Sequence, residues 1–116
     1  MFKLIGLLKK RSDVDFEYFK DYYENQHAPY ASEILPVGRD YRRNYVKRLR
    51  ANGVEVDDAF EYDVVTEMWF DDEVGYERFS AAMADAEIRR KIIADEEKFL
   101  DRSKSVIMIV EECISK

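Results

Sequence analysis

Short apolar runs recur along this chain and predict the strands of a small sheet. Large apolar side chains dominate residues 2–8, 62–70 and 106–110, which is typical of strands. A more charged stretch at residues 41–49 also resembles a strand around its Asn-Tyr-Val centre. Residues 50–58 contain an Asn-Gly pair, which indicates a loop or a hairpin turn.

Helical patterns fill the intervals between these strands. The first helix is expected to start at Ser12 and Asp13, which are good capping residues. It is expected to end one or two residues before Pro29, because proline disfavours helix at the position that precedes it. Two further helices are expected at residues 73–84 and 86–100, the former capped by two aspartates.

The resulting order, β-α-β-β-α-α-β, predicts an α+β protein of the ferredoxin-like kind, with a four-stranded antiparallel sheet and helices on one face. We expect residues 1–116 to form a single domain of this type. A face of the sheet that the helices leave open is normally polar. Residues 2–8 and 106–110, however, are apolar on both faces of the predicted strands. A second copy of the chain is the simplest cover, so a homodimer with sheet-to-sheet packing, a dimeric α+β barrel, is expected.

The charge balance narrows the classes of partner. The net charge of −6 disfavours nucleic acid and anionic membranes. Basic residues nevertheless gather between positions 39 and 50, either as an anion-binding patch or as a solvated strand and loop paired with acidic neighbours. We favour the second interpretation. No leader pattern and no apolar run of bilayer length is visible, so a cytoplasmic location is expected.

Cysteine and acidic residues offer little chemistry. Cys113 is the only cysteine, so no disulfide within the chain and no thiolate metal site is expected. Its place in an apolar run indicates a small packed side chain. The acidic run at residues 95–98 is typical of an exposed helix face. One histidine and scattered carboxylates make a poor metal site, so neither a metal nor a cofactor is expected.

His27, the only histidine, is the strongest candidate for chemistry. Together with Phe16, Phe19 and Tyr23 it falls within an arc of roughly 80° on a helical wheel, on an apolar stripe. An unperturbed imidazole titrates near pH ~6.5, which suits proton transfer at neutral pH. From spacing alone, two interpretations stay open: a general acid or base in a pocket, or a histidine that caps the helix end.

Several of these residues resemble a known family. The basic end of the first strand is followed by an F-x-x-Y-[WY] helix and an H-x-P motif, which together resemble the opening of the EthD family. In this chain they are Lys9-Lys10-Arg11, Phe19, Tyr22-Tyr23 and His27-Ala28-Pro29. Residues 67–70, 96–101 and 106–111 also resemble the family, so the resemblance covers nearly the whole chain.

The resemblance implies a dimeric α+β barrel with a pocket between sheet and helices, in which His27 takes the place of the family's histidine. Related barrels include cofactor-free cyclases, decarboxylases and dehydratases of aromatic polyketides, lactone isomerases, and monooxygenases with or without haem. We therefore expect a cofactor-free enzyme of the lyase or isomerase type, which moves protons on a small aromatic or lactone-like metabolite through His27. The expected substrate-binding residues are Tyr23, Tyr30, Tyr45, Trp69, Phe79 and Met83.

Two other functions stay open at this point. The protein could instead bind a hydrophobic metabolite without converting it, as an accessory protein of a catabolic oxygenase system. A haem-using relative is the third possibility, with His27 as the axial ligand. A small hydrophobic or aromatic ligand and a second copy of the chain are the expected partners.

Overall fold

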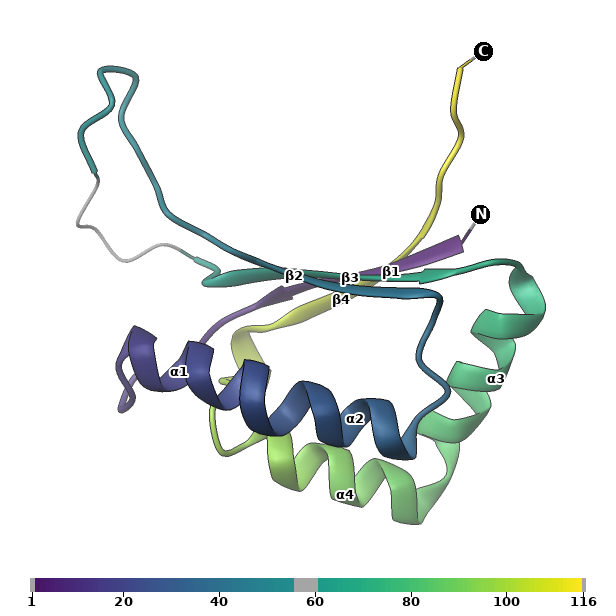
Figure 1. Cartoon of the computed structure of the whole chain (residues 1–116). Coiled ribbons are helices and arrows are strands. Elements are labelled where there is room, and N and C mark those ends of the chain that lie inside the picture. The colour runs from purple at the N-terminus through teal and green to yellow at the C-terminus, as the bar shows by residue number, and fades with distance from the viewer. Residues whose placement is uncertain (1, 56–60, 116) are drawn as a thin grey trace.

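A four-stranded antiparallel sheet carries every helix on one of its faces, as the computed structural model shows for residues 2–55 and 61–115 (Figure 1). The strands are β1 (Phe2–Leu8), β2 (Asp40–Tyr45), β3 (Val64–Phe70) and β4 (Val106–Glu111). Their spatial order is β2-β3-β1-β4, and each neighbouring pair is antiparallel. The predicted ferredoxin-like α+β architecture is therefore confirmed.

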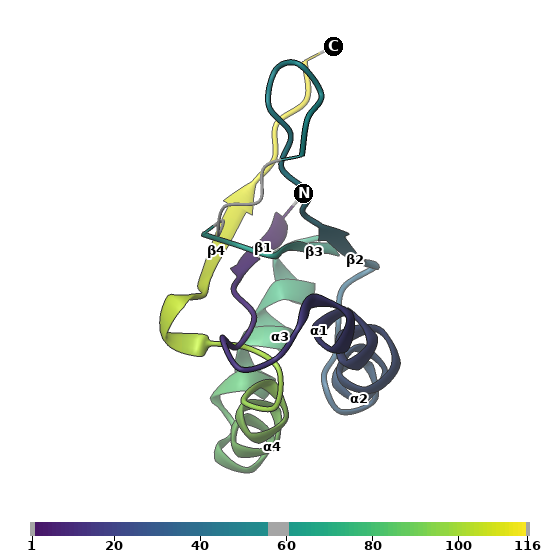
Figure 2. The same cartoon turned by 90° about the vertical axis from the view of Figure 1, so that its left-hand side faces the viewer.

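The helical layer lies along this sheet, as a view from the end makes clear (Figure 2). Its elements are α1 (Phe16–Tyr22), the π-helical segment η1 (Tyr23–His27), α2 (Ala28–Ile34), α3 (Glu73–Ala84), α4 (Ala86–Glu96) and the 3-10 turn η2 (Arg102–Lys104). Helix α3 has the predicted bounds, and Asp72 caps it by accepting a hydrogen bond from the Gly75 N–H. Helix α4 ends four residues before the predicted position 100.

The start of α1 differs from the prediction. Asp15, not Ser12 or Asp13, is the capping residue, and its Oδ1 accepts a hydrogen bond of 2.7 Å from the Tyr18 N–H. The Asp13 carboxylate is already occupied, because the Arg11 guanidinium donates to both of its oxygens at 2.8 and 2.7 Å. A local ion pair thus competes with the cap.

The prediction that the first helix ends before Pro29 is also wrong. The π-helical segment η1 precedes the proline, and the Ala28 N–H bonds to the Tyr23 carbonyl five residues back. Pro29 then occupies the first turn of α2, directly after this wider turn, where the hydrogen-bond pattern changes and a residue without an N–H group is tolerated. The wider turn therefore lets α1, η1 and α2 continue through the proline as one helical rod, with His27 at the junction.

Residues 46–55 form an extension beyond β2. The Arg50 N–H bonds to the Val54 carbonyl at 2.8 Å, and Leu49 pairs with Glu55 as an antiparallel bridge. Gly53 has φ of 84°, a conformation that glycine adopts without strain. Of the two interpretations of the Asn-Gly pair, the structure shows the hairpin turn. Residues 56–58 of the predicted loop lie outside the described part of the chain.

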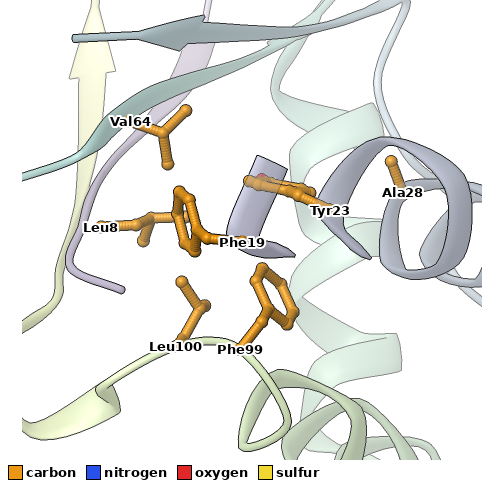
Figure 3. Close-up of a cluster of buried hydrophobic side chains, with 7 residues drawn as sticks. All are labelled: Leu8, Phe19, Tyr23, Ala28, Val64, Phe99 and Leu100. Atoms are coloured by element: carbon orange, nitrogen blue, oxygen red, sulfur yellow. The ribbon is translucent and has the colours of Figure 1, made fainter. Parts of the chain in front are cut away.

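Two buried clusters join the helices to the sheet. The first contains Leu8, Phe19, Tyr23, Ala28, Val64, Phe99 and Leu100 (Figure 3). The second contains Ala31, Leu35 and Ile92, with Phe79, Met83 and Ile88 packed against it. The even-numbered residues of β3 are all buried beneath the helices, whereas the odd-numbered ones, which point to the other face, are half-buried.

The face of the sheet away from the helices is not covered by any helix among residues 2–55 and 61–115. The Val106 and Met108 side chains, which share this face with Leu7 and Ile5, are 41 and 38% exposed. The 46–55 hairpin and the chain after β4 also extend to this side (Figures 1 and 2). Cys113 lies in that final stretch and is exposed, so the expectation of a packed cysteine is wrong for the single chain.

Two expectations about surface character can be compared with the structure. The basic residues between 39 and 50 largely pair with acids: Arg39 with Asp71, Arg42 with Asp40, Arg43 with Glu24 and Lys47 with Glu55. This is the arrangement expected of a solvated strand and loop. Among the described residues, no helix is both long and apolar enough to cross a bilayer.

Candidate active site

A cavity of about 240 Å³ lies between the sheet and the helices. Its apolar walls come from both layers and include Leu4, Met68, Phe79, Met83, Ile92 and Ile107. Its polar lining comes from His27, two tyrosines, Thr66, Glu96, Arg102 and Ser105. A mostly apolar hollow with a few converging polar groups is the usual form of a small-molecule site.

His27 is buried at the edge of this cavity and held by a carboxylate. The residue is 5% exposed, and its ring centroid lies 4.9 Å from that of Phe99 and 5.6 Å from that of Tyr23. Its Nδ1 atom is 2.8 Å from Oδ2 of Asp95. A carboxylate accepts hydrogen bonds, so this contact favours a ring that carries its proton on Nδ1.

Asp95 is itself fixed from two further sides. The Tyr22 hydroxyl donates to Oδ1 at 2.6 Å, and the Lys98 ammonium lies 3.7 Å from the same oxygen. Burial, followed by the bond to Asp95, raises the pKa of Tyr22, so this hydroxyl keeps its proton at neutral pH. Asp95 does not line the cavity. Asp95 therefore orients the His27 ring from outside the cavity. Within the described chain, Nε2 of His27 forms no hydrogen bond, so this nitrogen is left for a ligand.

Glu96 brings a second ionisable group to the cavity. The sequence predicted a solvated residue, yet its side chain is 23% exposed and lines the cavity, with Oε1 3.3 Å from Nε of Arg102. Burial raises the pKa of Glu96, while a protonated His27 ring and the Arg102 guanidinium act in the opposite direction. The carboxyl is thus easier to protonate than an exposed glutamate.

Three hydroxyl groups meet on the sheet side of the cavity. The Tyr23 hydroxyl is hydrogen-bonded to Thr66 Oγ1 at 2.7 Å and to the Tyr41 hydroxyl at 3.0 Å. Burial raises the pKa of Tyr23 to about 12 and that of Tyr41 well above its ordinary value. Both phenols therefore keep their protons at neutral pH and can donate them.

Comparison with known proteins places this geometry in a family. The model of the EthD domain matches residues 11–103, which is most of the chain. The chain belongs to the EthD family. A search of curated protein sequences found no significant match.

Solved structures agree with this assignment. An ethyl tert-butyl ether D (EthD) family protein from Bacillus halodurans is 26% identical, with a TM-score of 0.67 over 97% of this chain and 99% of that one. An EthD-like protein from Ralstonia eutropha is 18% identical, with a TM-score of 0.66 over 99 and 94%. A dimeric ferredoxin-like protein of unknown function from Thermobifida fusca is 18% identical, with a TM-score of 0.54 over 94 and 88%. The last two similarities concern the fold alone.

The residues expected at this EthD-family site fall into two groups. Tyr23, Phe79 and Met83 line the same cavity as His27. Tyr30 lies outside it, in a separate polar groove that faces the other side of Asp95. The groove is reached from solvent between α2 and α4, so Tyr30 does not meet the ring of His27 within the cavity.

Tyr45 and Trp69 also lie outside the cavity. The Tyr45 ring packs against Phe19, and its hydroxyl donates to Glu24 at 2.5 Å. Trp69 is an odd-numbered residue of β3 and therefore points to the face away from the helices, where the Lys3 ammonium lies 4.3 Å from its ring centroid. Strand alternation, which the sequence already contained, would have excluded Trp69.

Sequence reasoning missed Asp95, and a signal for it was present. Asp95 lies three residues after Ile92 and four before Phe99, and this spacing places it on one helical stripe with these two apolar residues. Thr66 and Tyr41 were also missed, because a hydroxyl in a strand is rarely informative by itself. No three His, Cys, Asp or Glu side chains gather as a metal site in the part of the chain that the structure describes.

Proposed function

We propose that this EthD-family protein is a cofactor-free enzyme of the lyase or isomerase type, which moves protons on a small aromatic or lactone-like metabolite. The observation that carries the proposal is the buried His27 ring, which borders the cavity while its Nδ1 lies 2.8 Å from Asp95. A ring protonated on Nδ1 offers the lone pair of Nε2 as a base, and a positioned acid or base contributes about 10²- to 10⁴-fold to a reaction rate.

The cavity supports a small, mostly apolar substrate. Its volume of about 240 Å³ lies below the range of roughly 300–1,000 Å³ that is common for drug-sized ligands. Phe79 and Met83 offer apolar contact from α3, and the Tyr23 ring adds an aromatic wall. A molecule with one ring and one or two oxygen atoms fits these properties best.

The proposal includes a homodimer formed by sheet-to-sheet packing. The open face presents Val106 and Met108 to solvent in the single chain, and a two-fold axis would place equivalent residues of two copies against each other. The structural neighbour from Thermobifida fusca is described as dimeric. We also propose a cytoplasmic location, since the exposed thiol of Cys113 suits a reducing compartment.

The test is a turnover screen with a matched pair of variants. Aromatic ketones, lactones and β-keto acids are incubated with the protein, and conversion is followed by proton NMR. His27→Ala is expected to lose about 10²- to 10⁴-fold in rate while keeping its circular dichroism spectrum. Gln26→Ala, an exposed neighbour on the same helical segment, is the control and keeps full activity.

Two results would count against catalysis by His27. Full activity of His27→Ala on any converted compound would remove the histidine from the reaction. Tight binding of many compounds without conversion of any would favour the alternative function, a small-molecule binding or accessory protein of an oxygenase system. Thermal-shift measurements on the same compounds separate these two cases.

A further inference from the structure

The three hydroxyls at the cavity have one proton more than their mutual hydrogen bonds use. Tyr23, Tyr41 and Thr66 each carry one hydroxyl hydrogen, and only two contacts join them, Tyr23 to Thr66 and Tyr23 to Tyr41. Each contact uses one hydrogen. These hydroxyls have no further hydrogen-bond partner among the described residues, and all three residues line the cavity. One donor is therefore available to a ligand.

Tyr23 is the best placed of the three to present that proton. Its hydroxyl is the only one with two hydroxyl partners, so both Tyr41 and Thr66 can donate to its oxygen and leave its own hydrogen unused. Hydrogen bonds from Thr66 and Tyr41 lower the pKa of Tyr23, although burial has the larger, opposite effect. A phenol that accepts two hydrogen bonds is polarised and becomes a stronger donor.

Among the charged groups near this cluster, Arg43 favours negative charge on a bound oxygen, and the Glu96 carboxyl on the cavity wall opposes it less strongly. The Arg43 guanidinium lies 4.8 Å from the ring centroid of Tyr41 and 5.8 Å from that of Tyr23. Glu24 holds Arg43 in place through two hydrogen bonds of 2.7 and 3.0 Å. The Tyr23 ring is also the neighbour of His27, with centroids 5.6 Å apart, so base and donor border one space.

We propose that the Tyr23 hydroxyl, supported by Tyr41 and Thr66, binds the carbonyl oxygen of an enolisable ketone or lactone and stabilises its enolate. This inference rests on the proposed function, because His27 is the base. His27 Nε2 takes a proton from the carbon next to the carbonyl, the C–H electron pair forms the enolate, and the negative charge develops on the oxygen. The imidazolium returns the proton to the same or another carbon, so no oxidant or reductant is needed.

The experiment uses para-nitrophenolate as a stable mimic of an enolate, with binding followed by its absorbance. Wild-type protein is expected to bind it at a pH where the imidazole is neutral. Tyr23→Phe is expected to bind about 10- to 100-fold more weakly, the value of one hydrogen bond to a charged group. Tyr41→Phe, which removes only a supporting donor, is expected to weaken binding about two- to fivefold.

Tyr18→Phe is the matched control, because Tyr18 is exposed on α1 and does not line the cavity, and it binds the phenolate as the wild type does. Unchanged binding in Tyr23→Phe, or a larger loss in Tyr41→Phe than in Tyr23→Phe, overturns the assignment of the donor. Tyr23 is buried in the core, so circular dichroism checks its variant. If Tyr23→Phe does not fold, the Tyr41→Phe/Thr66→Val double variant takes its place, and unchanged binding in that protein overturns the proposal.

A second measurement separates this inference from the proposed function. Exchange of the α-protons of phenylacetone in deuterium oxide reports proton removal by His27 and is followed by proton NMR. His27→Gln is expected to lose the exchange and to keep phenolate binding, while Tyr23→Phe slows the exchange about 10²- to 10³-fold. If wild-type protein shows no exchange but the pattern of phenolate binding holds, proton transfer fails and the oxyanion site stands.

Discussion

Replacing Asp95 with asparagine is expected to change which ring nitrogen of His27 carries the proton. In the wild type, Asp95 Oδ2 lies 2.8 Å from Nδ1, and the two side chains are only 12 and 6% exposed. A carboxylate can only accept, so the neutral ring keeps its proton on Nδ1. An amide can accept through its oxygen or donate through its nitrogen, so it supports either tautomer.

The size of the effect follows from the strength of the bond. A hydrogen bond to a charged group contributes about 1.5–3 kcal/mol, and ~1.4 kcal/mol corresponds to a factor of ten. The carboxylate therefore favours the Nδ1–H form by roughly 10- to 100-fold. Asp95→Asn removes most of this preference and also weakens the bond from Tyr22, with an expected loss of about 1 kcal/mol in unfolding free energy.

The assay is ¹⁵N NMR of the imidazole ring at about pH 9, where an unperturbed ring is neutral. His27 is the only histidine, so one set of ring signals reports the site without assignment. The wild type is expected to show Nδ1–H, and Asp95→Asn a mixture. Tyr22→Phe is the control, because it removes the other bond to Asp95 and leaves the contact with His27 in place.

Two results would refute the reasoning. A wild-type ring protonated on Nε2 would mean that Asp95 does not hold Nδ1–H in solution. If the fraction of the Nδ1–H tautomer in Asp95→Asn were the same as in the wild type, another group would set the tautomer. The first result would also remove the structural basis for Nε2 of His27 as the base.

Three further predictions concern stability and assembly. Burial raises the pKa of Glu96, so folding favours the protonated carboxyl. The ionised carboxylate therefore destabilises the folded chain once the pH rises through that raised pKa. Glu96→Gln should raise the melting temperature at neutral pH but not at acidic pH. Gly38→Ala should lower the unfolding free energy in urea by at least about 1–3 kcal/mol, because its Cβ would collide with the Trp69 carbonyl, whereas Gly75→Ala, with ordinary contacts inside α3, should raise it by about 0.5–1 kcal/mol. Met108→Glu, on the open face of the sheet, should convert the proposed dimer to monomers in analytical ultracentrifugation, and an unchanged sedimentation coefficient would contradict sheet-to-sheet packing.

Local patterns predicted the elements well wherever the physical signal was itself local. The bounds of α3 followed from an aspartate cap, and the β3 strand followed from its β-branched and aromatic residues. The first helix was predicted less well, because Asp13 pairs with Arg11 and because a π-helical turn carries the chain through Pro29. Both effects depend on hydrogen bonds that no propensity scale contains.

The candidate site shows the same division. His27 on an apolar stripe was visible in the chain, and so was the need to cover two apolar sheet faces. Asp95 is 68 residues from His27, and Thr66 is 43 residues from Tyr23, so their meetings depend on how the whole chain packs. Trp69 and Tyr45 were placed in the pocket by residue type, and the direction of each side chain put them elsewhere.

The amino-acid sequence by itself determined the order of strands and helices, their apolar faces and the single imidazole, because these depend on neighbours within a few residues. Only the tertiary structure decided that a carboxylate holds that imidazole and that three hydroxyls meet at the same cavity. Hydrogen bonds of this kind need positions matched to within a few tenths of an ångström. Such precision arises only when sheet and helices have packed together.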